Sequence, residues 1–344
     1  MEHPHYFAGG NTACGFFSCF EDILPAPRRK RMFYLKGGPG VGKSTLMKRA
    51  AAYAQGRGLQ TELFHCSSDP DSLDGVCLPQ RGLALMDGTS PHVYDPAVPA
   101  ARDTLLALGD FLDEDALRPH AKDIAALQAE ISARFRRCYR YLSAARECYQ
   151  APEAGRMDDT RAEALARAIA DTFPLRGERG TVRRLFAAAY TPRGRVEVLR
   201  LAEAAHVTKV ELPFGLYATG LMQRLSAMAI SRGLDVVELL DPLSPGEIAH
   251  LYLPGHDIAV MTGQRPREEE GWVEADSLFT LADDREQGFD RNAFELLIQR
   301  ATEQLSAAKA LHDQLEGYYS GHMDFLKWQK VLDRVLEEID QAEN

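Results

Sequence analysis

The segment Gly37–Thr45, with the sequence GGPGVGKST, constrains the fold of this chain more than any other feature. It matches the pattern G-x-x-x-x-G-K-[ST], in which a glycine-rich loop turns its backbone N–H groups toward bound phosphates. Residues 32–35 are apolar and predict a buried strand before the loop, and residues 46–52 predict a helix after it. This order of strand, loop and helix indicates an α/β domain that binds a nucleoside triphosphate.

Each residue type in this loop has a part in that prediction. Glycine lets the backbone wrap closely around phosphates, Lys43 would neutralise charge on the β- and γ-phosphates, and the Ser44 hydroxyl would bind Mg²⁺. The alternative is a glycine-rich turn that contains Lys-Ser by coincidence. The residues expected to contact the nucleotide are Gly37, Gly38, Pro39, Gly40, Val41, Gly42, Lys43, Ser44 and Thr45.

Length and composition limit the number of domains and the kinds of partner. The chain has 344 residues, enough for about two domains. Its formal net charge of −10 argues against a broad nucleic-acid or anionic-membrane surface, although a local basic patch remains open. Its six cysteines have no zinc-like spacing, and it has neither a signal-like start nor an apolar run of about 20 residues. We therefore expect a cytoplasmic protein with reduced thiols.

The chain also contains an internal repeat. The Leu-Met pair at 46–47 recurs at 221–222, an offset of 175 residues, and at the same offset the apolar stretch 83–86 matches 258–261. Met157-Asp158 and Met323-Asp324 form a weaker pair at an offset of 166, and such drift is expected from small insertions in a tandem duplication. Chance similarity between two α/β patterns is the alternative.

We accordingly predict two tandem three-layer α/β domains with helical hairpin extensions. The first would span residues 1–175 and the second residues 176–344, with a linker near 173–180. Amphipathic stripes of apolar residues at spacings of three and four predict long helices over 124–149 and 294–318 and a last helix over 328–339.

The second copy has lost the residues that phosphate binding needs. Lys43 corresponds to Ala218 and Gly42 to Tyr217, so that only the hydroxyl of Ser44 survives, as Thr219. A tyrosine where the loop must turn is incompatible with close wrapping of the backbone. We therefore expect a degenerate second domain, free to contact a protein partner, and we expect polar residues lost together with the loop to belong to the site.

Asp87 is the first such residue. It ends the apolar stretch 83–86, as a Walker B carboxylate that holds Mg²⁺ does, and it corresponds to Thr262 in the second copy. A capping or turn role is the alternative. Gly88 follows it where many ATPases carry a glutamate, which weakens the prediction of vigorous hydrolysis. His92 is either a γ-phosphate sensor or a histidine of a solvent-exposed loop.

An acidic segment supplies further candidates. Residues 61–66 predict the second strand, and residues 67–75 then predict a loop at its carboxyl end, where ligands bind in α/β sheets. Asp69, Asp71 and Asp74 in this loop correspond to Ser244, Gly246 and Ala249, so we expect at least one of them, with Asp69 and Asp74 preferred, to orient a nucleophile or accept its proton. A turn rich in Asp, Ser and Pro that caps helices is the alternative.

Several of these segments together resemble a known family. They are HYFAGGNT at 5–12, the glycine-rich loop with LMK at 46–48, HCSSD at 65–69, SLDG at 72–75 and DGTSPH at 87–92. They resemble a bacterial family of duplicated P-loop ATPases of unassigned biological role, closely over the first half and loosely over the second. Members of that family carry the loop in both halves, whereas this chain lacks the second. The resemblance implies binding of Mg-ATP and allows its hydrolysis.

The sequence therefore favours a Mg²⁺-dependent ATPase with one competent site. Lys43, Asp69 and Asp74 would act in catalysis, and Ser44 and Asp87 would hold the metal. No N-K-x-D stretch indicates guanine, so ATP is the default nucleotide. Two alternatives stay open, namely a small-molecule or nucleotide kinase and a nucleotide-gated switch that binds a partner through its second half.

Overall fold

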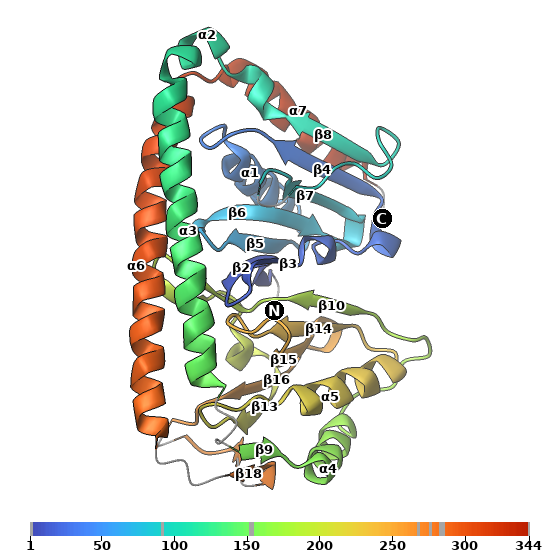
Figure 1. Cartoon of the computed structure of the whole chain (residues 1–344). Helices are drawn as coiled ribbons and strands as arrows, with labels where there is room; N and C mark the ends of the chain where they lie inside the picture. The colour runs from blue at the N-terminus through green and yellow to red at the C-terminus, as the bar shows by residue number, and fades with distance from the viewer. Residues whose placement is uncertain are drawn as a thin grey trace.

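The computed structural model describes residues 3–90, 93–150, 155–266, 269–274, 277–281 and 286–342. His92 lies outside these residues. The chain is an α/β protein with two sheet-rich regions, one above the other in Figure 1, and a pair of long helices runs along both of them.

The first sheet is built around a strand that is buried on both faces. The sequence RMFYLK at 31–36 is apolar at its four central positions, and those four residues are buried, as in the centre of a parallel sheet. Across the sheet, the described strands follow in the order β1 (His5–Phe7), β5 (Glu62–Cys66), β6 (Asp69–Leu78), β7 (Leu83–Asp87), β4 (Arg31–Lys36) and β8 (Asp103–Ala107). Strand β6 is antiparallel to its neighbours β5 and β7, whereas β4 is parallel to β7 and β8.

The second sheet repeats this topology. Its described strands follow in the order β10 (Val182–Leu185), β14 (Val236–Leu240), β15 (Ile248–Leu253), β16 (Ile258–Gly263), β13 (His206–Glu211) and β17 (Trp272–Val273). Strand β15 is antiparallel to β14 and β16, and β13 is parallel to β16 and β17, which matches β6 and β4 of the first sheet. Helix α1 (Lys43–Gln55) follows β4, and α5 (Thr219–Ser231) follows β13 in the same position.

A smaller sheet joins the two halves. Among the described residues its order is β12 (Gly194–Glu197), β11 (Ala188–Thr191), β2 (Gly9–Thr12) and β3 (Gly15–Ser18), so that one hairpin comes from each half. The backbones of Phe7 and Phe186 exchange two hydrogen bonds of 2.9 and 3.0 Å beside it. Nearby, the Arg183 guanidinium donates two hydrogen bonds, of 2.8 and 3.0 Å, to the buried carboxylate of Glu62. The interface between the halves is therefore a continuous part of the core.

The long helices pack mainly against each other and also contact the small sheet that joins the halves. Helix α3 (Ala121–Tyr149) of the first half and α6 (Gln287–Ser320) of the second lie side by side, with Cys138, Leu142, Ala301 and Leu305 buried between them and the sheets. At about 44 and 51 Å, both helices are long enough to pass both sheets. The predicted helices are thus present, but the expected hairpin within each half is wrong. Spacing shows which face of a helix is apolar, and it does not show which partner covers that face.

The short helices that follow are exchanged as well. Helix α7 (Phe325–Gln341) belongs to the second half by sequence, yet its Trp328, Leu332 and Val335 lie in one buried cluster with Leu46 of α1. Helix α4 (Asp159–Ala170) from the first half packs against α5 of the second half in the same way. Besides short 3₁₀ turns, the remaining described elements are α2 (Glu114–Leu117) and the paired strands β9 (Gly155–Met157) and β18 (Phe279–Leu281).

The start of each exchanged helix is capped in the same manner. The Asp158 carboxylate accepts from two backbone N–H groups at the start of α4, and Asp324 does so at the start of α7. The pair found at an offset of 166 residues thus consists of two equivalent N-caps. The expected domain boundary near residue 175 stays a prediction, since the core of each half contains a helix from beyond it.

All six cysteines lie within the described residues as free thiols. None of the helices in the described parts of the chain is long and apolar enough to cross a membrane.

The exchange of α7 makes a testable prediction. Replacing Leu332, which is 3% exposed, by alanine should lower the free energy of unfolding by about 2–5 kcal/mol, because it leaves a cavity in the core of the first half. Leu326→Ala on the same helix should change it little, since that side chain is 81% exposed. Urea unfolding gives the energies, and hydrogen exchange should quicken more in α1 than in α5. Equal acceleration in both helices would contradict a specific role of α7 in the first half.

Candidate functional site

The glycine-rich loop (residues 37–42) has a backbone conformation that favours glycine. Gly37, Gly40 and Gly42 have φ angles of 151°, 72° and 80°, in the left-handed region that other residues rarely adopt. Gly42 is also the N-cap residue of α1, and no side chain caps that helix end. The first N–H groups of α1 are therefore open to an anion, and the helix dipole favours one there.

Lys43 is folded back onto this loop. Its ammonium group donates hydrogen bonds of 2.7 and 3.0 Å to the carbonyl oxygens of Gly37 and Gly38, and it lies 3.7 Å from Asp87 Oδ2. Both charged side chains are 13% exposed. The lysine thus already lies over the loop, held by two neutral carbonyls that a phosphate oxygen could replace with a stronger, charge-assisted bond.

Ser44 tethers the loop to the sheet. Its Oγ accepts a hydrogen bond of 3.0 Å from the backbone N–H of Leu73 in β6, and Thr219 Oγ1 accepts one of the same length from Ile248 in β15. A bond that is kept in both halves serves the shared fold. The hydroxyl of Ser44 still has a second lone pair, which is available to a metal ion.

Asp87 lies where the sequence places it, at the end of β7 next to β4, opposite Leu35. One carboxylate oxygen accepts from both the backbone N–H and the hydroxyl of Thr89. The other oxygen faces Lys43. The same carboxylate is therefore oriented by the loop that follows it and remains close to the glycine-rich loop.

Asp74 is the buried acid of the site. It is 6% exposed, and this burial raises its pKa to about 8. The negative charge of Asp87 adds to the rise, while a hydrogen bond from Cys66 and the charge of Lys43 oppose it. Two carboxylates that repel each other beside one lysine form a place where a divalent cation would lower the electrostatic energy.

The acidic segment differs from its predicted form. Residues 67–75 were expected to form a loop, but Asp69–Leu78 is strand β6, antiparallel to both neighbours, with an irregular register opposite His65 and Cys66. Alternation along a strand sends neighbouring side chains in different directions. Asp71 therefore lies in solvent and pairs with Arg193, whereas Asp74 lies inside. Asp69 accepts a 2.9 Å hydrogen bond from Ser72 at the open edge of the site.

The second half contributes residues that the sequence did not indicate. The Tyr319 ring lies 3.5 Å from where a Cβ on Gly38 would stand, and the Glu316 carbonyl oxygen lies 2.9 Å from that point on Gly40. Trp328 Nε1 lies 2.8 Å from the same point on Gly42. The contacts at Gly40 and Gly42 are too short for a Cβ and explain the need for glycine there, whereas 3.5 Å at Gly38 is an ordinary van der Waals contact. The sequence gives no signal for them, because the three residues belong to the exchanged end of the other half.

Trp328 is notable because its polar atom is unpartnered. The residue is 4% exposed, and its indole N–H makes no hydrogen bond within the described residues. Its ring lies 5.3 Å from the Arg49 guanidinium of α1. A buried donor next to the glycine-rich loop is available to a ligand bound there.

The equivalent place in the second half is filled by aromatic rings. Tyr217 stands where the first half has Gly42, and its hydroxyl lies 3.0 Å from Ser244, the counterpart of Asp69. The Tyr149 ring packs on Tyr217 with a centroid distance of 5.3 Å, and Phe214 and Phe294 pack on Tyr149 and on each other at 4.9 to 5.6 Å. This packing leaves the corresponding loop without the open glycine backbone of the first half.

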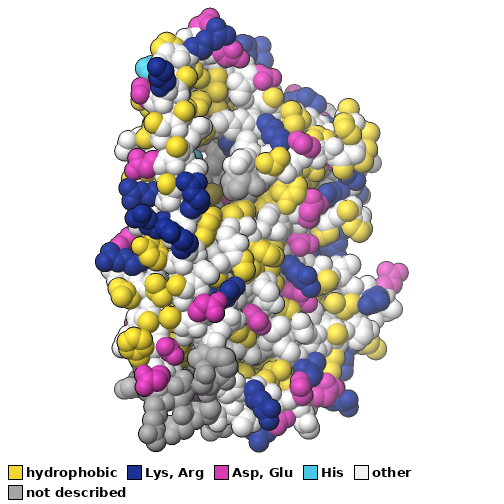
Figure 2. Space-filling model, in the orientation of Figure 1, with side chains coloured by type: hydrophobic (Ala, Val, Ile, Leu, Met, Phe, Trp, Pro, Cys, Tyr) yellow, Lys and Arg dark blue, Asp and Glu magenta, His cyan; other side chains and the backbone are white. Residues whose placement is uncertain are grey.

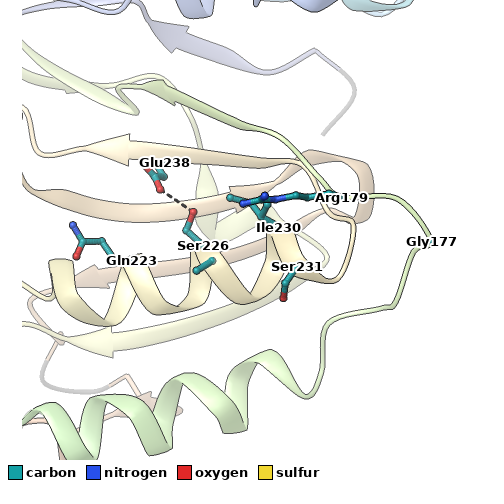
Figure 3. A pocket seen from close by; sticks show the side chains of 8 residues that line it. Gly177, Arg179, Gln223, Ser226, Ile230, Ser231 and Glu238 are labelled. Carbon is teal, nitrogen blue, oxygen red and sulfur yellow. Dashed lines mark hydrogen bonds between the residues drawn. The ribbon is translucent and has the colours of Figure 1, made fainter.

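Two hollows in the described surface contain none of the predicted site residues. One of about 520 Å³ lies on α5 and β14, where Ser226 donates a 2.8 Å hydrogen bond to Glu238 (Figure 3). Another is lined by Ala133 and three arginines of α3, namely Arg136, Arg137 and Arg140. Basic side chains also gather over the long helices in Figure 2. This group is the local basic patch that the net charge left open.

Comparison of the chain with protein-family models, with curated proteins and with solved structures found no match. The function of this chain is therefore inferred from its own residues.

The raised pKa of Asp74 predicts how stability depends on pH. A carboxyl whose pKa is higher in the folded state binds more protons folded than unfolded, so the contribution of Asp74 to stability should fall as pH rises from about 4 to about 8. Asp74→Asn should remove this fall, and the gain at pH 8 should be about 1.4 kcal/mol for each unit by which the pKa is raised. Asp71→Asn is the matched control, because Arg193 lowers the pKa of that exposed acid. Urea unfolding from pH 5 to pH 8 measures both, and an unchanged slope in Asp74→Asn would refute the assignment.

Proposed function

We propose that this protein is a Mg²⁺-dependent P-loop ATPase with one competent nucleotide site, in its first half. The observation that carries the proposal is the glycine-rich loop between β4 and the uncapped start of α1, with left-handed backbone at Gly37, Gly40 and Gly42 and with Lys43 above it. The second sheet, with the same strand order and with Tyr217 and Ala218 at the equivalent loop, supports a degenerate duplicate.

The roles of the residues follow from their chemistry. Backbone N–H groups of the loop and of the first turn of α1 would bind the phosphates, and Lys43 would leave its carbonyl partners for the β- and γ-phosphates. Ser44 and Asp87 would hold Mg²⁺, with Asp74 beside them as an acid whose charge the ion stabilises. Magnesium held by these residues would neutralise part of the phosphate charge.

Hydrolysis would be an in-line displacement at the γ-phosphorus. The water oxygen forms a bond to phosphorus, the bond to the bridging oxygen breaks, and ADP leaves with that electron pair. The proton of the water passes to a carboxylate of β6. Asp69, whose side chain is 31% exposed, or Asp74, once bound Mg²⁺ keeps it ionised, would accept this proton.

Two observations each favour an alternative function. Asp87 is followed by Gly88 and Thr89, and Thr89 donates hydrogen bonds back to the Asp87 carboxylate, so the position after Asp87 carries no acid that could activate water. This favours transfer to an acceptor hydroxyl, as in a kinase. The contact of Tyr319 and Glu316 with the loop favours a switch in which the nucleotide changes how the second half binds a protein partner.

The proposal is tested by ATP turnover in the presence of Mg²⁺. Lys43→Ala should reduce turnover by at least about a hundredfold, because a cation that neutralises the transferred phosphoryl group is lost. Lys48→Ala is the control, since that lysine is exposed on the same helix one turn further on. A panel of hydroxyl acceptors distinguishes a kinase from an ATPase, because a kinase consumes ATP only when an acceptor is present. Equal turnover in Lys43→Ala and wild type would refute the proposed site.

A further inference from the structure

Helix α6 of the second half crosses the open edge of the candidate site. The backbone of its last turn, at Glu316 and Ser320, lies against Gly40 of the loop. Two turns earlier on the same face, the Lys309 ammonium lies 3.7 Å from Asp69 Oδ2 at the start of β6. Seven residues of helix separate these two contacts, a distance of about 10 Å along the axis. This length is comparable to that of an extended triphosphate.

Lysines lie at both ends of this path, and aspartates lie between them. Lys43 lies beside Asp87 at one end, and Lys309 lies beside Asp69 at the other, with Asp74 buried between the two acids and affected by both their charges. Lys309 also donates a hydrogen bond to Asp313 of its own helix. Partial burial acts to lower the pKa of Lys309, but the bond to Asp313 and the charges of Asp69, Asp313 and Glu316 raise it above its ordinary value. The group is therefore a cation at neutral pH.

We propose that Lys309 is part of the nucleotide site and binds the γ-phosphate, so that the second half distinguishes ATP from ADP. This inference rests on the proposed function. It extends that function by assigning to the other half of the chain the cation that reads the terminal phosphate.

The position of Lys309 fits the γ-phosphate better than the inner phosphates. The loop and the first turn of α1 surround the inner phosphates, and Lys43 comes from that side. Lys309 comes from the opposite side, across Asp69, and only a group that projects from the loop toward β6 comes within its reach. Its present partners are solvated carboxylates, with the Lys309 side chain 29% and Asp69 31% exposed. Exchange of such a partner for a phosphate oxygen costs little, because partly exposed ion pairs are weak.

The contact would connect the nucleotide to the rest of the second half. From Lys309, α6 continues as one helix to Phe294, which packs on the aromatic rings at the degenerate loop. On the way, Ser306 donates a 2.6 Å hydrogen bond to the Pro192 carbonyl oxygen beside β11. A change at Lys309 therefore bears directly on the second half through packed helix and hydrogen bonds.

The test compares two ligands by titration calorimetry in the presence of Mg²⁺, adenylyl imidodiphosphate as a non-hydrolysable ATP analogue and ADP. Lys309→Ala should weaken the analogue about tenfold and leave ADP within about twofold, because only the analogue carries the terminal phosphate. Lys309→Arg keeps the positive charge and should restore most of the difference. Lys330→Ala, an exposed lysine of α7, is the matched control and should change neither affinity.

The outcomes separate this inference from the proposed function. Lys43→Ala should weaken binding of both ligands, because Lys43 would contact the β-phosphate that both carry. Lys309→Ala should weaken binding of the analogue alone. If Lys309→Ala loses affinity equally for the analogue and for ADP, or loses it for neither, the role of Lys309 is refuted. Binding of both ligands by the wild-type protein would in that case still support the site itself. Wild-type protein that binds neither ligand would overturn both proposals. Thermal unfolding of each variant checks that it is folded.

Discussion

The pairing of α3 with α6 is the interaction on which the rest of the structure depends. Each helix starts from one half and ends on the loop that follows the fourth strand of the other, with Tyr319 on Gly38 and Tyr149 on Phe214. The pair carries α4 and α7 to the opposite halves, where they complete the cores of α5 and α1. Neither sheet region has a full core without the helix that the other half supplies. The candidate site inherits this dependence, because Glu316, Tyr319 and Trp328 form one of its sides.

Much of the local structure could be predicted from the sequence, because it depends on neighbours in the chain. The apolar run before the loop, the glycines of the loop and the stripes of the long helices gave β4, α1, α3, α6 and α7 with small errors at their ends. The exchange of helices could not be predicted. An apolar stripe has the same spacing whichever partner covers it, and the offsets of the repeat are identical for exchanged and unexchanged halves.

The sequence likewise predicts only part of the arrangement of the candidate site. Lys43, Ser44 and Asp87 lie together as their motifs indicate, and Asp74 joins them. The three aspartates were treated as one loop, but β6 separates them, so that Asp71 pairs with Arg193 outside while Asp74 is buried. An Asp-Pro-Asp-Ser run has the composition of a turn, and only its pairing with β5 and β7 makes it a strand. The roles of these residues in ATP chemistry remain a prediction that the proposed measurements address.

Ser44 and Thr219 accept equivalent hydrogen bonds in the two halves, and this has a consequence for how a duplicated chain can diverge in sequence. In the second half the hydroxyl holds β15 in place although Tyr217 and Ala218 stand where the first half has Gly42 and Lys43, so this hydrogen bond serves the fold without depending on phosphate. Two equal copies that exchange helices would form an intertwined dimer, and one chain containing both copies keeps that geometry with a fixed ratio of one to one. One loop is then free to lose its lysine. The second copy cannot be lost, because its helices α6 and α7 still form one side of the candidate site in the first half.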